Sequence, residues 1–354
     1  MKLKTSITSI ALGAVLLALG VCAFVESPSA APAPTPAPAI LITGAGATFP
    51  YPIYSKWFDE YHKLHPDMDF NYQSLGSGAG VRQILAGTVD FGASDMPMTD
   101  DQLHQAKTKI LHFPTVLGAD VPTYNIPGVN QELNFTQEAL AGIFLGKITK
   151  WNDPAITGPN KGVNLPDTDI IVVHRSEGSG TTYIWVDYLS KISEEWRTKV
   201  GKNSSVNWPV GLGGKGNEGV SGMVKQQPGA IGYVELIYAI QNNMPYGKVR
   251  NSAGVFVKAD LASVTAAAAG AAKSMPDDFR VSITDAPGKA AYPISSFTWL
   301  LVPDKIQDPT KKKAIVDFLH WMVKDGQGMV EALSYAKLPK EVVAKETKAM
   351  TMVN

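Results

Sequence analysis

Two extended apolar stretches decide the fold that we expect for this chain. The first reads FPTVLGADVPTYNIP from Phe113 to Pro127, and it is too long to end at a normal hairpin. The second reads YPISSFTWLLVPD from Tyr292 to Asp304 and precedes a helical stretch. Since helix and strand patterns flank both, we expect the chain to leave one lobe through the first stretch and to return to it through the second. This arrangement predicts a hinge-bending protein with two lobes.

The chain from Ile40 onward favours an α/β fold. Short apolar runs alternate with amphipathic stretches. Residues 51–65 place their large apolar side chains on one helical face, which predicts a helix packed on the core. The 354 residues are enough for about two domains. We predict that lobe 1 covers residues 40–115 and 289–354, and that lobe 2 covers residues 116–288.

The N-terminal residues differ in composition from the rest. Residues 1–26 hold two lysines and then an uninterrupted apolar run, which predicts a secretory signal. An uncleaved membrane anchor, which needs about 20 apolar residues, is the alternative. The only cysteine, Cys22, lies here, and its lipidation is less favoured because the bulky Val21 precedes it. Residues 27–39 alternate proline and alanine, which predicts an extended tether.

Charge and motif content argue against several other classes of protein. Lys plus Arg and Asp plus Glu both number 32, so no general basic surface for nucleic acid is expected. The phosphate-loop pattern GxxxxGK followed by Ser or Thr is absent, and so is the hydrolase pattern GxSxG. The six histidines form no recognised metal pattern. We therefore expect no enzyme, no cofactor or metal, and no nucleic-acid partner.

Three glycine-rich turns are candidates for an anion site. They read GAGATF (44–49), GSGAGVRQI (76–84) and RSEGSGTT (175–182), and each precedes or begins a predicted helix. Thr48 is predicted to cap the first of these helices, and Ser77 and Thr181 lie near the starts of the other two. The unpaired N–H groups and the dipole of a helix N-terminus favour negative charge. Arg175 adds a guanidinium fork. One such turn is most often an ordinary capped turn, but three together indicate a site for a tetrahedral oxyanion.

Asp95 is an acid among these donors. The stretch FGASDMP places it at the carboxyl end of a predicted strand, where open α/β sheets bind ligands. A phosphate that still carries a proton can donate it to a carboxylate, whereas sulfate at neutral pH cannot. The alternative is that Asp95 caps the helix that follows.

Six stretches together resemble one family. GAGATFPYPIYSKW, NYQSLGSGAGVRQI, DFGASDMPMT, RSEGSGTT, LGKITKWNDP and GAIGYVE resemble the periplasmic phosphate-binding proteins of the phosphate-specific ABC transport system, from about Thr43 to the end. The resemblance implies a two-lobe type II periplasmic-binding fold, with a central cleft where hydrogen bonds alone hold a dehydrated phosphate. It also implies a periplasmic monomer that delivers phosphate to the transmembrane permease subunits of an importer. A binding protein or receptor for sulfate, molybdate or arsenate is the alternative.

The resemblance also implies a set of ligand residues. Carried onto this sequence, the phosphate ligands of the family fall on Thr48, Phe49, Ser77, Asp95, Arg175, Ser179, Gly180 and Thr181. Two positions depart from the family pattern. Glu177 stands where an aspartate usually pairs with the arginine, which is expected to make Arg175 less rigid. Gly78 replaces a serine that often follows the Ser77 position.

Overall fold

A computed structural model describes residues 40–129 and 131–354 of the chain. The predicted signal segment and tether, residues 1–39, lie outside the described residues. Among the residues that are described, no helix is long and apolar enough to cross a membrane.

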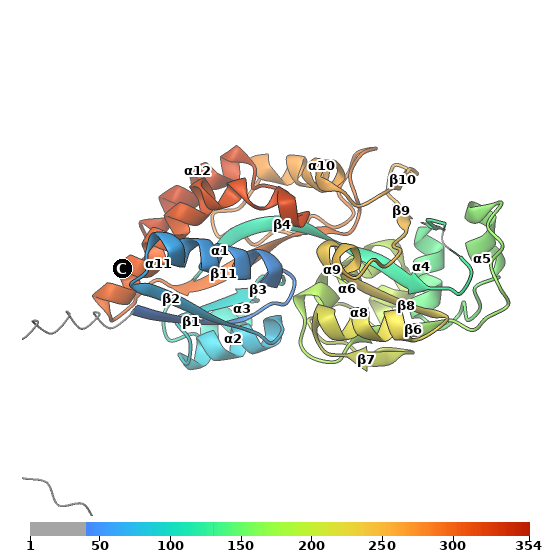
Figure 1. The fold of residues 1–354 in the computed structure, drawn as a ribbon, viewed down its shortest axis with the longest axis horizontal. Helices are drawn as coiled ribbons and strands as arrows, with labels where there is room; N and C mark the ends of the chain where they lie inside the picture. Colours follow the sequence, from blue (N-terminus) through green and yellow to red (C-terminus); the bar gives the residue numbers. More distant parts are fainter. Residues whose placement is uncertain (1–39, 130) are drawn as a thin grey trace, which may run out of the picture. The chain divides into compact units, whose positions relative to one another are not determined.

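A mixed sheet forms the centre of the part that we call lobe 1. Its strands β1, β2 and β3 are parallel, whereas β11 runs antiparallel to both β3 and β4. In spatial order the strands are β2 (Met68–Ser74), β1 (Ile40–Gly46), β3 (Phe91–Ser94), β11 (Ser295–Pro303) and the first part of β4 (Ile110–Asn125). Figure 1 shows α1 (Tyr51–Leu64) and α11 (Pro309–Lys324) on one face of this sheet and α2 (Ser77–Ala86) on the other.

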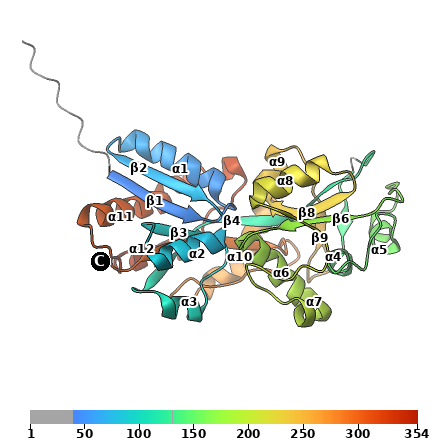
Figure 2. The same cartoon turned by 90° about the horizontal axis from the view of Figure 1, so that it is seen from below.

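A second group of strands forms the part that we call lobe 2. The end of β4 pairs with β8 (Ala230–Glu235), which is followed by β6 (Ile171–Arg175) and β7 (Leu212–Gly214). Figure 2 shows α8 (Gly216–Gln226) and α9 (Leu236–Gln241) on one side of these strands and α6 (Gly180–Ile192) on the other. The helices α6 and α8 begin directly after β6 and β7, so their N-termini lie at the carboxyl ends of parallel strands.

The remaining elements lie around these two groups. They are α3 (Asp100–Gln105), β5 (Asn134–Phe135), α4 (Gln137–Phe144), α5 (Pro154–Thr157), α7 (Glu194–Lys199), β9 (Lys248–Arg250), β10 (Phe256–Val257), α10 (Leu261–Lys273) and α12 (Lys340–Met350), with short 3-10 turns at Gly158–Asn160, Gly326–Gly328 and Glu331–Leu333. Strands β10, β9 and β5 form a small separate sheet.

The long strand β4 belongs to both groups of strands, as Figure 1 shows. Ala119 still lies opposite Ser295 of β11, but the next residue, Asp120, lies opposite Glu235 of β8. All of β4 except its last residue is buried, including the polar residues His112, Thr115, Asp120 and Thr123. The first predicted crossing is therefore one strand that changes partners. The second, β11, pairs only within lobe 1.

Helix α1 matches its sequence pattern and holds the first glycine-rich turn against the core. Its buried side chains are those predicted from the helical period: Ile53, Tyr54, Trp57, Phe58 and Tyr61. Phe58 and Tyr61 contact Phe318 of α11 with ring centroids 5.4 and 5.3 Å apart. Trp57 Nε1 donates to the Gly326 carbonyl at 2.8 Å. This packing fixes the start of α1, where Thr48 and Phe49 precede the helix.

Candidate anion-binding site

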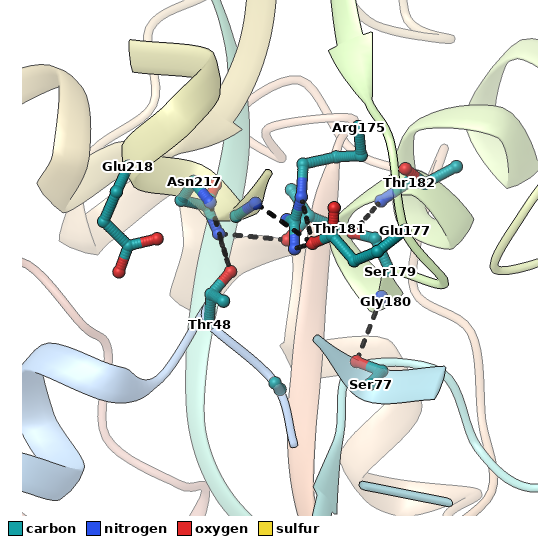
Figure 3. A network of polar contacts seen from close by, with 12 residues as sticks. Thr48, Ser77, Arg175, Glu177, Ser179, Gly180, Thr181, Thr182, Asn217 and Glu218 are labelled. Atoms are coloured by element: carbon teal, nitrogen blue, oxygen red, sulfur yellow. Dashed lines mark hydrogen bonds and ion pairs between the residues drawn. The ribbon is translucent and has the colours of Figure 1, made fainter. Parts of the chain in front are cut away.

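The turns predicted to face an anion meet where the two lobes touch. Figure 3 shows Thr48 and Ser77 of lobe 1 beside the residues of lobe 2 that follow β6. Gly180 N donates to Ser77 Oγ at 3.0 Å, and Asn217 Nδ2 donates to Thr48 Oγ1 at 2.8 Å. Because these hydrogen bonds run from lobe to lobe, the structure describes the arrangement in which the lobes are closed on each other.

Thr48 reaches this meeting point because strand β1 ends in a glycine. Gly46 has a φ of +146°, and a Cβ on it would lie 2.0 Å from the Ala93 carbonyl oxygen, so no other residue fits there. The prediction that Thr48 caps α1 is wrong, because Pro50 occupies the cap position. The Thr48 hydroxyl is thus available to Asn217 and lies on the side of lobe 2.

Phe49 is anchored behind the site. Its side chain is fully buried, and Tyr335 Oη donates to its carbonyl oxygen at 2.6 Å. A Cβ on Gly118 of β4 would lie 2.6 Å from the Phe49 ring, so this glycine leaves room for the ring. The ring and the carbonyl together fix the backbone whose N–H group is the predicted ligand.

Asp95 directly follows β3 and is buried. Thr298 Oγ1 of β11 donates to Asp95 Oδ1 at 2.7 Å, and Ser77 Oγ lies 3.4 Å from Asp95 Oδ2 as a long donor. Burial raises the pKa of Asp95 to about 7, although these hydrogen bonds and the charge of Arg175 oppose the shift. The alternative role of Asp95 as a helix cap is wrong, because Thr99 caps the helix that follows.

Arg175 is the last residue of β6, and its guanidinium group is almost fully buried. Its Nε donates to Glu177 Oε1 at 2.9 Å, and its Nη2 contacts the same oxygen. Glu177 Oε1 also accepts from Gly216 N at 3.1 Å. The third nitrogen, Arg175 Nη1, is buried and has no hydrogen-bond partner among the described residues. Glu177 therefore holds one edge of the guanidinium group and leaves Nη1 without a hydrogen-bond partner among the described residues.

The first turn of α6 supplies the remaining predicted ligands. Ser179 Oγ accepts from Thr182 N at 3.0 Å and so caps the helix. A Cβ on Gly180 would lie 2.5 Å from Ser77 Oγ and 2.6 Å from the Asp95 carboxylate, so only glycine lets α6 approach lobe 1 this closely. Thr181 is fully buried, and its hydroxyl accepts from Asn217 Nδ2 at 3.2 Å.

Comparisons with known proteins agree with this geometry. A family model described as a PBP superfamily domain matches residues 28–326. The phosphate-binding protein PstS of Pasteurella multocida is 48% identical over 85% of this chain and 87% of its own length. PstS of Xylella fastidiosa (strain Temecula1) is 46% identical over 85% of this chain and 82% of its own length. The chain belongs to the PstS family of phosphate-binding proteins.

A solved structure shows the same fold as this PstS-family chain. It is a high-affinity periplasmic phosphate-binding protein with phosphate bound, and it aligns with a TM-score of 0.68 at 21% sequence identity. The alignment covers 88% of this chain and 93% of that chain. The predicted α/β class and the two-lobe type II fold are thereby confirmed.

The sequence analysis missed two polar side chains of this PstS-family site. Thr298 lies in an apolar strand, where its partner Asp95 is 203 residues away in the chain. Asn217 lies near the start of α8, within the stretch GGKGNEG (213–219), which begins at the end of β7. A fourth glycine-rich turn before a helix was the available signal for Asn217. For Thr298, the only signal was a polar residue flanked on both sides by aromatic side chains.

Buried acids behind the site modify its electrostatics. Asp120 and Glu235 are opposite each other on β4 and β8, and both are fully buried. Burial raises the pKa of each well above its usual range, and the nearby Asp95 adds to the shift. Burial therefore favours the neutral, protonated form of both acids. The described site thus combines the Arg175–Glu177 pair, the buried carboxyl of Asp95 and neutral hydrogen-bond donors.

Proposed function

We propose that this chain captures inorganic phosphate between its two lobes and delivers it to an ABC importer. The observation that carries the proposal is that a buried carboxyl of lobe 1, Asp95, and a buried arginine of lobe 2, Arg175, lie near the meeting point of the lobes, and that Arg175 Nη1 has no hydrogen-bond partner among the described residues. Membership of the PstS family supports the same function.

The proposed ligands come from both lobes. Backbone N–H groups, hydroxyls, one guanidinium and one carboxylate hold the anion, through Thr48, Phe49, Ser77, Asp95, Arg175, Ser179, Gly180 and Thr181. We also propose the lobe ranges 40–115 with 289–354, and 116–288. The change of strand partners at Asp120 supports a division close to the first of these boundaries.

Asp95 favours phosphate over the alternative oxyanions. A protonated phosphate oxygen can donate to the Asp95 carboxylate, whereas sulfate or molybdate would place an acceptor against an acceptor. Arsenate carries a proton as phosphate does, so the same argument does not separate these two. Titration calorimetry of the purified protein with phosphate, sulfate and arsenate at pH 8 tests the proposal. Failure to bind phosphate, or sulfate binding within about tenfold of phosphate, would contradict it.

We propose that the chain binds phosphate without converting it, and that it acts as a periplasmic monomer. The relatives are named as binding proteins, which fits this proposal. A phosphatase assay on the purified protein tests the first part, since any hydrolysis above the buffer rate would contradict it. Light scattering of the free protein measures its mass and tests whether it is a monomer. Capture of the phosphate-loaded protein by the detergent-solubilised permease of the same transport system tests delivery to the importer.

A further inference from the structure

Asn217 lies between the two threonines of the site and contacts both of them. It is fully buried near the start of α8. Its Nδ2 donates to Thr48 Oγ1 at 2.8 Å and to Thr181 Oγ1 at 3.2 Å, as Figure 3 shows. One amide thus contacts a hydroxyl of lobe 1 and a hydroxyl of lobe 2 at the same time.

The orientation of this amide is fixed by the backbone. Glu235 N donates to Asn217 Oδ1 at 2.9 Å. A backbone N–H group can only donate, so the atom that faces it must be the amide oxygen. The NH₂ group therefore faces the threonines, and the amide cannot turn over without leaving a buried donor unpaired.

This orientation determines where the threonine protons point. A hydroxyl has one proton and two acceptor positions. Thr48 Oγ1 accepts from Asn217 Nδ2 and, at 3.3 Å, from Asn217 N, so both acceptor positions are filled. Its own proton has to be donated elsewhere. At Thr181 the second N–H of the same amide fills one acceptor position and favours the same outcome.

We propose that Asn217 is a positioning residue that makes both threonine hydroxyls donors to the anion, an inference that rests on the proposed function. Oxygens of the anion that face these hydroxyls have to be unprotonated acceptors. The protonated oxygen of phosphate is thereby left to face Asp95, the carboxylate among the proposed ligands. Because Thr48 belongs to lobe 1 and Asn217 to lobe 2, this orientation is completed only when the lobes close.

The test is a mutant cycle read by phosphate titration. Asn217→Leu, with Asn217→Ala in parallel in case the leucine variant does not fold, is combined with two backgrounds. One is Thr48→Val with Thr181→Val, which removes both hydroxyls; the other is Thr48→Ser with Thr181→Ser, which keeps them. Loss of Asn217 is expected to weaken phosphate binding about 10- to 100-fold in the wild-type and serine backgrounds. In the valine background, the same substitution is expected to weaken phosphate binding by less than about threefold.

Asn160 provides a matched control within lobe 2. It is also a buried asparagine, whose Oδ1 accepts from Asn134 N at 2.7 Å and whose Nδ2 donates to the Asn134 and Ile156 carbonyls. Asn160→Leu is expected to lower the melting temperature but to change phosphate affinity by less than about twofold. If an Asn217 substitution weakened phosphate binding by the same factor in the valine and serine backgrounds, the inference would be overturned but the proposed function would not. Wild-type protein that binds no phosphate would overturn both the inference and the proposed function.

Discussion

The two lobes bring opposite chemistry to the same site. Lobe 1 contributes Asp95, which Thr298 and Ser77 contact, and lobe 2 contributes Arg175, which Glu177 holds along one edge. A guanidinium group attracts any oxyanion, whereas a carboxylate accepts only an anion that carries a proton. We infer that lobe 2 supplies most of the affinity and lobe 1 most of the selectivity. The predictions that follow test this division.

Asp95→Asn is expected to produce the largest change, and to produce it in selectivity. A site that leaves a polar group repelled or unpaired rejects a ligand, and at pH 8 the carboxylate form of Asp95, which repels sulfate, predominates. An amide can turn its NH₂ group to sulfate and its oxygen to phosphate, so this rejection should be lost while much of the phosphate binding remains. Titration of wild type and variant with both anions at pH 8 measures the change. A variant that keeps full discrimination would show that selectivity does not come from lobe 1.

Arg175→Ala should mainly reduce affinity. Hydrogen bonds to charged groups contribute about 1.5 to 3 kcal/mol each, so the loss of one or two of them should weaken phosphate binding about 10- to 10⁴-fold. Arg175→Lys should also bind weakly, because lysine lacks the planar fork that contacts Glu177 and the ligand together. The control is Arg250→Ala in lobe 2, whose side chain pairs with Glu138 at the surface. Phosphate binding by Arg175→Lys at the wild-type level would remove the role we assign to Arg175.

The pH should change sulfate binding through lobe 1. Burial raises the pKa of Asp95 to about 7. Below that pH the protonated carboxyl can donate to sulfate, and above it the carboxylate repels sulfate. Sulfate affinity of the wild type should therefore rise about tenfold from pH 8 to pH 6, as the protonated fraction of Asp95 rises. Calorimetry at three pH values measures this, and Asp95→Asn should show a flat profile. A wild-type profile as flat as that of the variant would argue against titration of Asp95.

Glu177→Asp should have the smallest effect. The shorter acid restores the family pattern and still reaches Arg175, but it gives up the hydrogen bond that Glu177 accepts from Gly216 N at 3.1 Å. This bond is charge-assisted, but it holds Glu177 and does not involve the anion directly, so its loss should change phosphate affinity by about tenfold or less. Phosphate titration of the variant checks this, and a loss as large as that of Arg175→Ala would mean that Glu177 contributes to binding beyond holding the arginine.

Local sequence patterns determined much of the secondary structure. The apolar face of α1 follows from the period of its side chains, and the start of α6 follows from the cap that Ser179 provides. The α/β class could be predicted from the sequence because it also depends on local patterns of apolar and polar side chains. The ligand set came from the resemblance to the family, and in the structure these residues lie at the meeting point of the lobes, where their role remains a proposal.

Only the tertiary structure decided the partners of these residues. Asn217 meets a threonine 169 positions away, and β4 changes partners between Ala119 and Asp120. Thr48 does not cap α1 as the sequence predicted, because Pro50 occupies the cap position. Side-chain period and capping depend on neighbours within a few residues, so the sequence by itself could determine them. Pairing across the sheet and across the lobes depends on how the whole chain packs, because the free energy of a buried polar group depends on whichever partner the fold places beside it.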